Sequence, residues 1–217
     1  AEALRLGRML ASLTPRDPES LGLLALMELQ ASRLKARTGP DGQPILLADQ
    51  DRSRWDRLLI RRGLAMLERI EQLGGTAGPY ALQAAIAACH ACAATVEDTD
   101  WVRITALYDG LAQISPSPVV ELNRAVATAQ AFGPQAGLDL VLPLFDVREL
   151  RSYHLLPAVA GDLLCRTGQH AQAREQFLRA ASLTGNGSER LTMQRRAAAC
   201  ATHPSGKDRS DPARPVV

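Results

Sequence analysis

Two thiols and an imidazole lie within one short segment, because residues 88–93 read Ala-Cys-His-Ala-Cys-Ala. Such a group can bind zinc or exchange a disulfide. A zinc site needs two more ligands, and a redox pair stands at a helix start after a strand, whereas this pair falls in an alanine-rich helical pattern. No second pair at ligand spacing exists among Cys165, Cys200, His154, His170 and His203. We therefore interpret Cys89 and Cys92 as packing residues, with a metal or redox site as the alternative.

The histidines and the sequence motifs indicate no active site. His90 fits either a satisfied polar contact or a residue of a binding groove. His154 precedes a predicted helix, where it either caps that helix or faces a pocket, and we favour the cap. The chain contains no Gly-x-Ser-x-Gly elbow, Ser-His-Asp order or phosphate loop. We expect no catalytic residues, no metal and no cofactor, and hence a protein that is not an enzyme.

The composition predicts a helical protein that folds without disulfides. The 217 residues are 46% hydrophobic and 4% aromatic, alanine is abundant, and β-branched residues rarely cluster. Four cysteines without an export signal suggest reduced thiols in a cytoplasm. The formal net charge of +2 gives no strong field for a phosphate backbone, so direct nucleic-acid contact is not expected. No apolar run approaches the roughly 20 residues that cross a membrane, so no membrane partner is expected.

The first third of the chain predicts an N-terminal helical subdomain over residues 1–73. Apolar residues recur at helical spacing over 4–13, which indicates a short amphipathic helix. Asp17 supplies a cap and Pro18 a first helical position for a second helix that continues to about Arg37. The elements that follow are a turn at 38–44 and a long amphipathic helix over about 51–73.

The later residues repeat with the period of tetratricopeptide hairpins. Loop residues recur at spacings of 34 and 35, namely Thr99, Gly133 and Gly168. A residue expected at the crossing of two packed helices precedes each loop by seven positions; these residues are Cys92, Val126 and Gly161. We therefore predict an all-α fold in which an N-terminal helical subdomain precedes a tetratricopeptide-like helical-hairpin solenoid with a capping helix over 74–202. Residues 203–217 offer no large apolar side chain before Val216 and predict a disordered tail.

Polar residues on the first helix of each hairpin are binding candidates, because these helices line the concave side of such a stack. Asn123 and Arg124 have donors that can hold a peptide backbone or a carboxylate, although we favour a role in tying adjacent repeats together. Asp162 and Arg166 are placed to join the same groove. Two aromatic residues are interpreted as core, Trp101 and Tyr108.

Six longer stretches distinguish this sequence from a generic helical repeat. They are Glu19-Ser-Leu-Gly-Leu-Leu-Ala-Leu-Met27, Asp49-Gln-Asp-Arg-Ser-Arg-Trp-Asp56, Gly78-Pro-Tyr-Ala-Leu-Gln-Ala-Ala-Ile-Ala-Ala-Cys-His-Ala91, Ser117-Pro-Val-Val-Glu-Leu-Asn-Arg-Ala-Val126, Tyr153-His-Leu-Leu-Pro157 and Asn186-Gly-Ser-Glu-Arg190. With these stretches the chain, from Ala1 to about Cys200, resembles the C-terminal domain of a group of bacterial extracytoplasmic function (ECF) RNA polymerase sigma factors. In that group a tetratricopeptide-like helical region is appended to two promoter-reading domains, which would lie outside this chain.

The resemblance implies a regulatory or protein-interaction role in transcription initiation, without catalytic residues. The implied partners are the promoter-reading domains of the same full-length protein, the RNA polymerase core and a small protein of the YCII-like type. We expect an interaction segment composed of Asp49, Gln50, Asp51, Arg52, Trp55 and Asp56. We expect a partner or ligand groove composed of Tyr80, Gln83, His90, Asn123, Arg124, Tyr153, His154, Asp162 and Arg166.

The alternative function is a small-ligand sensor. Its cavity would lie where the N-terminal helices meet the repeats, near Tyr80, Gln83, His90, Tyr153 and His154.

Overall fold

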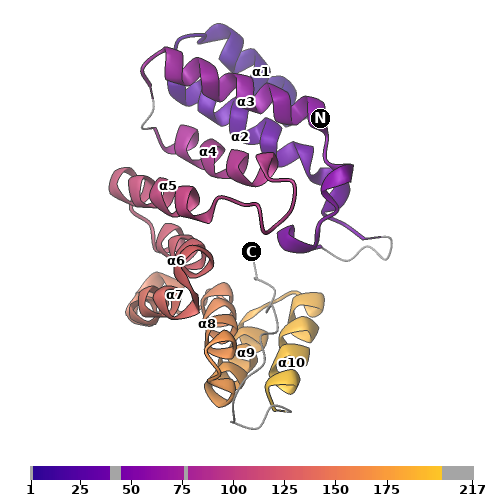
Figure 1. The fold of residues 1–217 in the computed structure, drawn as a ribbon, viewed down its shortest axis with the longest axis vertical. Coiled ribbons are helices and arrows are strands. Elements are labelled where there is room, and N and C mark those ends of the chain that lie inside the picture. The colour runs from indigo at the N-terminus through magenta and orange to yellow at the C-terminus, as the bar shows by residue number, and fades with distance from the viewer. Residues whose placement is uncertain (1, 40–44, 76–77, 202–217) are drawn as a thin grey trace. The chain divides into compact units, whose positions relative to one another are not determined.

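The computed structural model describes residues 2–39, 45–75 and 78–201, and these residues form an all-α protein (Figure 1). Ten α-helices and five short 3₁₀ helices make up this described part, which contains no β-strand. The predicted all-α fold class is therefore confirmed. The predicted tail, and residues 40–44 of the predicted turn, lie outside the described residues.

The helices divide into two compact units with separate cores, unit 1 (Ala1–Pro116) and unit 2 (Ser117–Val217). In unit 1, helix α2 packs against α1, α3 and α4, and α5 packs against α4. The boundary expected after residue 73 falls inside unit 1, between α3 and α4. The helices of unit 1 are α1 (Glu2–Leu13), α2 (Pro18–Ser32), α3 (Arg57–Gln72), α4 (Pro79–Cys92) and α5 (Trp101–Ile114).

Capping aspartates fix where α2 and α3 begin. The Asp17 carboxylate accepts a hydrogen bond from the Ser20 amide at 3.0 Å, with Pro18 in the first turn, as predicted. Helix α3 begins later than predicted, because the Asp56 carboxylate accepts from the first amides of that helix. The residues before it form a separate 3₁₀ turn, Arg52–Arg54, and then an extended Trp55.

Unit 2 consists of helical hairpins followed by one further helix. Helix α6 packs against α7, α8 packs against α9, and α10 packs against α9. The turns inside the first two pairs contain Gly133 and Gly168, whose φ angles of 99° and 79° favour glycine. The helices are α6 (Pro118–Phe132), α7 (Pro134–Val141), α8 (Leu155–Arg166), α9 (His170–Leu183) and α10 (Gly187–Ala201).

The predicted repeat register holds in unit 2 and fails at one position of unit 1. Gly161 lies at a close helix crossing, because a Cβ added there would stand 2.9 Å from the Phe177 ring. Val126 is buried as well. Cys92, in contrast, is exposed at the last residue of α4. The prediction that Cys92 fills a buried crossing is therefore wrong.

Candidate functional site

Helix α1 turns large apolar side chains toward solvent. The small residues Gly7 and Ala11 form the buried side of this helix, where Gly7 lies against the Met27 and Leu24 side chains of α2. This close approach leaves the bulky residues on the other side, and we call them the α1 face: Leu6 (51% exposed), Met9 (46%), Leu10 (41%) and Leu13 (74%). The amphipathic pattern therefore predicted a helix correctly, but its large apolar residues do not form the core.

The expected interaction segment is a strap that holds the C-terminal end of α4. The Arg52 guanidinium donates hydrogen bonds to the carbonyl oxygens of His90 and Ala93, the latter at 2.8 Å. The same guanidinium lies 4.9 Å from the centre of the Trp55 ring, which is buried. A cation at the last carbonyls of a helix stabilises that helix end. Arg52 and Trp55 therefore serve the internal packing of unit 1.

The other polar groups of this segment are also used locally. The Asp51 carboxylate accepts from Ser53, the Asp56 carboxylate caps α3, and Gln50 is buried. Among the described residues, three buried polar atoms of the segment lack a hydrogen-bond partner, namely Gln50 Oε1, Arg52 Nε and Trp55 Nε1. Since such atoms are rare, the strap is the least completely satisfied polar part of unit 1.

The first thiol pair lies at the end of α4. Cys89 is half-buried, and burial raises the pKa of its thiol, whereas Cys92 is exposed. The His90 ring packs edge to face against Trp101, with 5.2 Å between ring centres. Burial, aided by the positive charges of Arg33 and Arg52, lowers the pKa of His90 to about 4. His90 is therefore a neutral packing residue near pH 7.

The residues expected to line one cavity are divided between the two units. In unit 1, Tyr80 is exposed, and the Gln83 amide donates to the Pro79 carbonyl of its own helix at 3.1 Å. Tyr153 and His154 belong to unit 2. A cavity that draws on both sets stays a prediction.

A buried ion cluster joins α8 to α10 in unit 2. The Asp162 carboxylate, 4% exposed, accepts from the Arg196 guanidinium and lies 3.9 Å from Arg166 Nη1. Burial raises the pKa of Asp162, although the two arginines oppose this shift. Arg196 also lies over the Phe177 ring, 4.5 Å from its centre. The structure thus brings the expected pair Asp162 and Arg166 together and adds Arg196, which no local pattern in the sequence indicates.

A hollow beside this cluster is too small for a metabolite. Its free volume is about 10 Å³, roughly the space of one water molecule. It is lined by Val126, Ala129, Gln130, Val159, Asp162, Leu163 and Arg166.

On α6, Arg124 donates to the Glu121 carboxylate at 2.9 Å, and Asn123 beside it is half-buried.

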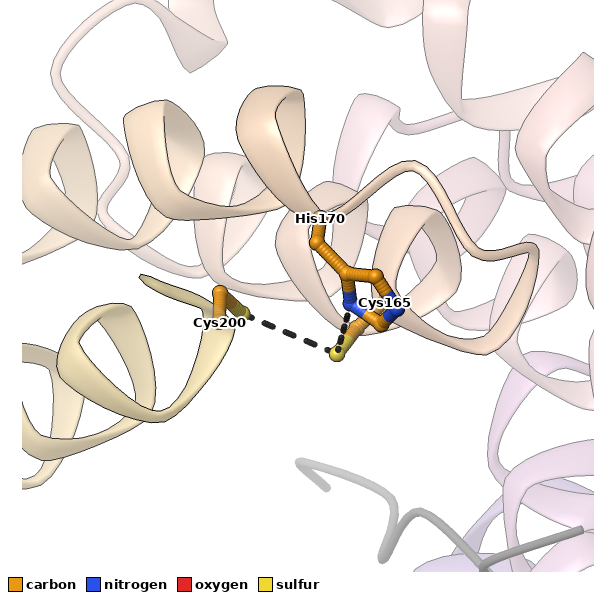
Figure 2. Close-up of side chains that lie close together, drawn as sticks. All are labelled: Cys165, His170 and Cys200. Carbon is orange, nitrogen blue, oxygen red and sulfur yellow. Dashed lines mark hydrogen bonds between the residues drawn. The ribbon is translucent and has the colours of Figure 1, made fainter. Parts of the chain in front are cut away.

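A second group of ligating side chains lies where α8, α9 and α10 meet (Figure 2). Cys165 Sγ is 3.7 Å from His170 Nδ1 and 3.6 Å from Cys200 Sγ. The three ligand atoms all lie within 4.8 Å of one another. These residues form no pair at ligand spacing in the sequence, and the fold brings together two cysteines that are 35 positions apart.

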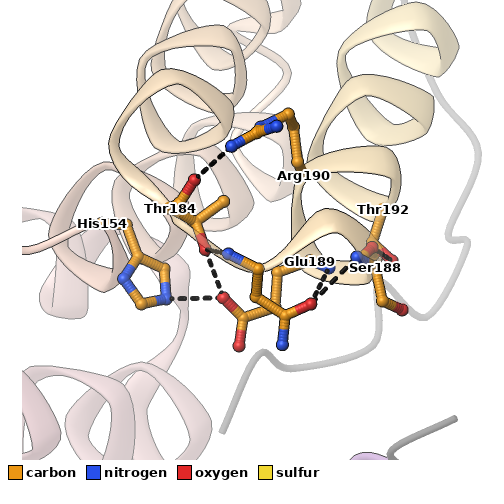
Figure 3. Close-up of polar contacts among 7 residues, drawn as sticks. His154, Thr184, Ser188, Glu189, Arg190 and Thr192 are labelled. Atoms are coloured by element: carbon orange, nitrogen blue, oxygen red, sulfur yellow. Dashed lines mark hydrogen bonds and ion pairs between the residues drawn. The ribbon is translucent and has the colours of Figure 1, made fainter.

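His154 belongs to a polar network rather than to a helix cap (Figure 3). Although it stands at the N-cap position of α8, its side chain makes no capping hydrogen bond, so the predicted cap is wrong. Its Nε2 lies 3.2 Å from the carboxylate of Glu189 on α10. The Thr184 hydroxyl donates to the same carboxylate, and Arg190 donates to the Thr184 carbonyl at 2.9 Å. The network therefore fastens the start of α8 to the start of α10.

Both aromatic residues that were interpreted as core, Trp101 and Tyr108, are half-buried on α5. Burial raises the pKa of Tyr108 to about 12.

Within the described part of the chain, no helix combines the length and apolar character needed to cross a membrane.

Comparison with known proteins gives two similarities. Residues 1–71 match a family described as a family of unknown function (DUF6596). The chain is 46% identical over 188 residues to a protein of Rhizobium meliloti (strain 1021) named "Uncharacterized protein R00370". That match covers 87% of this chain and 44% of the relative, so the chain spans less than half of the relative's length. No solved structure matches the chain.

Proposed function

We propose that this chain is a regulatory, protein-interaction domain of an ECF-type RNA polymerase sigma factor and has no catalytic role of its own. The single observation that carries the proposal is the α1 face. Its four large apolar side chains are between 41% and 74% exposed on one helix. Exposed apolar groups gathered on one helix face support a site of contact with another protein.

The proposed occupant is a promoter-reading domain of the same longer protein. The six stretches that resemble the sigma-factor group support this choice. The similarity to a relative with more than half of its length outside the match also supports it. The α1 face lies within the residues that match the family of unknown function. The net charge of +2 favours a protein over a nucleic acid as the direct partner.

Docking of this kind would regulate transcription by competition. A promoter-reading domain held on the α1 face is less available to DNA or to the polymerase core. Each large apolar side chain that becomes fully buried contributes about 1.5–3 kcal/mol. A few such residues are enough to shift the balance between a docked and a released domain. The polymerase core and a YCII-like small protein remain further proposed partners that would act on this balance.

The test is transcription by the full-length protein. We expect the triple change Leu6→Gln, Met9→Gln and Leu13→Gln to misregulate transcription while the chain stays folded. Deletion of residues 1–202 should have at least as large an effect. The matched control changes two exposed apolar residues of unit 2, Leu178→Gln and Leu191→Gln, which are 42% and 47% exposed.

Two results would overturn the proposal. One is a coding sequence before residue 1 that lacks promoter-reading domains. The other is normally regulated transcription from the protein that lacks residues 1–202.

A further inference from the structure

The ends of three helices bring two thiols and an imidazole together in unit 2 (Figure 2). Cys165 lies near the end of α8, His170 begins α9, and Cys200 lies near the end of α10. The distances are 3.6 Å between the two sulfur atoms and 3.7 Å between Cys165 Sγ and His170 Nδ1. In a tetrahedral zinc site, bonds of about 2.3 Å to sulfur and 2.0 Å to nitrogen separate two sulfurs by about 3.8 Å and a sulfur from a nitrogen by about 3.5 Å. Both distances therefore match edges of such a tetrahedron.

The surrounding helices hold this arrangement in place. Asp162 is one turn before Cys165 on α8, and Arg196 is one turn before Cys200 on α10. Their buried ion pair fixes the two helices that carry the thiols. A ligand set positioned by packed neighbours needs little rearrangement to bind a metal ion.

The charges of the group also suit a divalent cation. A divalent ion displaces the thiol protons: Zn²⁺ and two thiols give a bis-thiolate complex and two protons, which pass to the solvent. Two thiolates neutralise the charge of the ion, as a partly buried site requires.

We propose that Cys165, His170 and Cys200 form a zinc-binding site in unit 2. The imidazole contributes a neutral nitrogen ligand, and the two sulfurs contribute thiolates. Cys165 and His170 are only half-buried. A water molecule or a side chain from a partner therefore completes the tetrahedron, as in zinc sites with three protein ligands.

The test is metal binding by the full chain under reducing conditions, with Zn²⁺ and Co²⁺ as probes. We expect about one equivalent of zinc per chain by elemental analysis and the release of protons on binding. With Co²⁺ we expect thiolate charge-transfer bands and the strong visible bands of a tetrahedral complex. Loss of a residue that only supports a metal ligand weakens metal binding about 10–100-fold. Loss of a ligand itself should weaken zinc binding more than about 100-fold, and we expect this for each of the single variants Cys165→Ser, Cys200→Ser and His170→Gln. His170→Gln keeps the test valid if a cysteine variant fails to fold, because His170 is half-buried at a helix start.

The chain supplies its own control. The double variant Cys89→Ser and Cys92→Ser removes two thiols, as many as the proposed site contains, and should retain full zinc binding. A chain that ends at residue 201 should retain it too, because all three proposed ligands precede that residue.

The proposal would be overturned by a reduced chain that binds no stoichiometric zinc. Zinc binding that survives loss of the three ligands, or that disappears with Cys89 and Cys92 or with residues 202–217, would overturn it equally. If the thiols only fill space in the core, the reduced chain binds no stoichiometric zinc.

Discussion

The two thiol pairs of this molecule lie in different surroundings. Cys89 and Cys92 are three positions apart near the end of one helix, one half-buried and the other exposed. Cys165 and Cys200 are 35 positions apart on two helices, yet their sulfur atoms are 3.6 Å apart beside an imidazole. The two cysteines that are close in sequence thus lie in different environments, whereas the two that are distant in sequence lie side by side. Helix packing, rather than a local motif, creates the second group.

Arginines stabilise the surroundings of both pairs in different ways. Near the first pair, Arg52 binds backbone carbonyls at the end of α4. Near the second, Arg196 pairs with a buried carboxylate on a neighbouring helix. The first interaction fixes one helix end, whereas the second fixes the position of one helix against another. Only the second can hold together ligands that come from different helices.

The largest expected effect that separates the two regions is the acid sensitivity of His90. Its pKa is lowered from 6.5 to about 4 in the folded chain, so the unfolded chain takes up a proton at higher pH than the folded chain does. The stability from neutral His90 is therefore present above about pH 6.5 and is lost as the pH falls to about 4. We expect a loss of about 3 kcal/mol over this range, measured by chemical denaturation at each pH. His90→Gln should remove that part of the pH dependence, and an unchanged profile in this variant would show that His90 is not a buried neutral group.

The next effect concerns the strap. Arg52→Ala removes charged hydrogen bonds to the end of α4 and should lower the free energy of unfolding by about 2 kcal/mol. Cys89 should react faster with a thiol-modifying reagent, while the reaction rates of Cys165 and Cys200 stay the same. Arg54→Ala is the matched control, because Arg54 is an exposed arginine of the same 3₁₀ turn. Equal effects of the two changes would argue against the strap.

A smaller effect is expected at the crossing of α8 and α9. The Cβ of Gly161→Ala would stand 2.9 Å from two carbon atoms of the Phe177 ring, which is 1% exposed and has little room to move. We expect a loss of about 1–2 kcal/mol in urea denaturation. Cys165 lies one turn beyond Gly161 on α8, so the rate at which Cys165 reacts with a thiol-modifying reagent should change as well. Gly185→Ala, where an added Cβ meets nothing within 4 Å, should be nearly neutral.

The smallest effect is expected at Cys92. Because this residue is exposed at a helix end, Cys92→Ser should change the free energy of unfolding by less than about 0.5 kcal/mol. A loss of more than 1 kcal/mol in the same denaturation experiment would show that Cys92 is packed after all. The comparison between the two thiol pairs would then lose its basis.

Local signals in the sequence were sufficient for the helices and for several of their ends. Alanine-rich patterns and the scarcity of aromatic residues predicted an all-α fold, and Asp17 with Pro18 marked the start of α2. The glycine positions at 133 and 168 predicted the turns of two hairpins. These features depend on backbone conformation and on hydrogen bonds between near neighbours. The identities of a few adjacent residues therefore determine them.

Tertiary packing decided which faces of the helices are buried and which side chains meet. The apolar spacing of residues 4–13 did not show that Gly7 and Ala11 would be the buried residues of α1. They are buried because α1 lies close to α2, and only small residues fit between two helices at that distance. The His154 side chain, which we expected to cap α8, instead contacts the carboxylate of Glu189, which follows 35 positions later. The meeting of Cys165, His170 and Cys200 likewise depends on how three helices pack. Helices and turns follow from the residue order because they depend on near neighbours. The meeting of distant side chains follows only from the packed fold, because it depends on contacts between segments far apart in the chain.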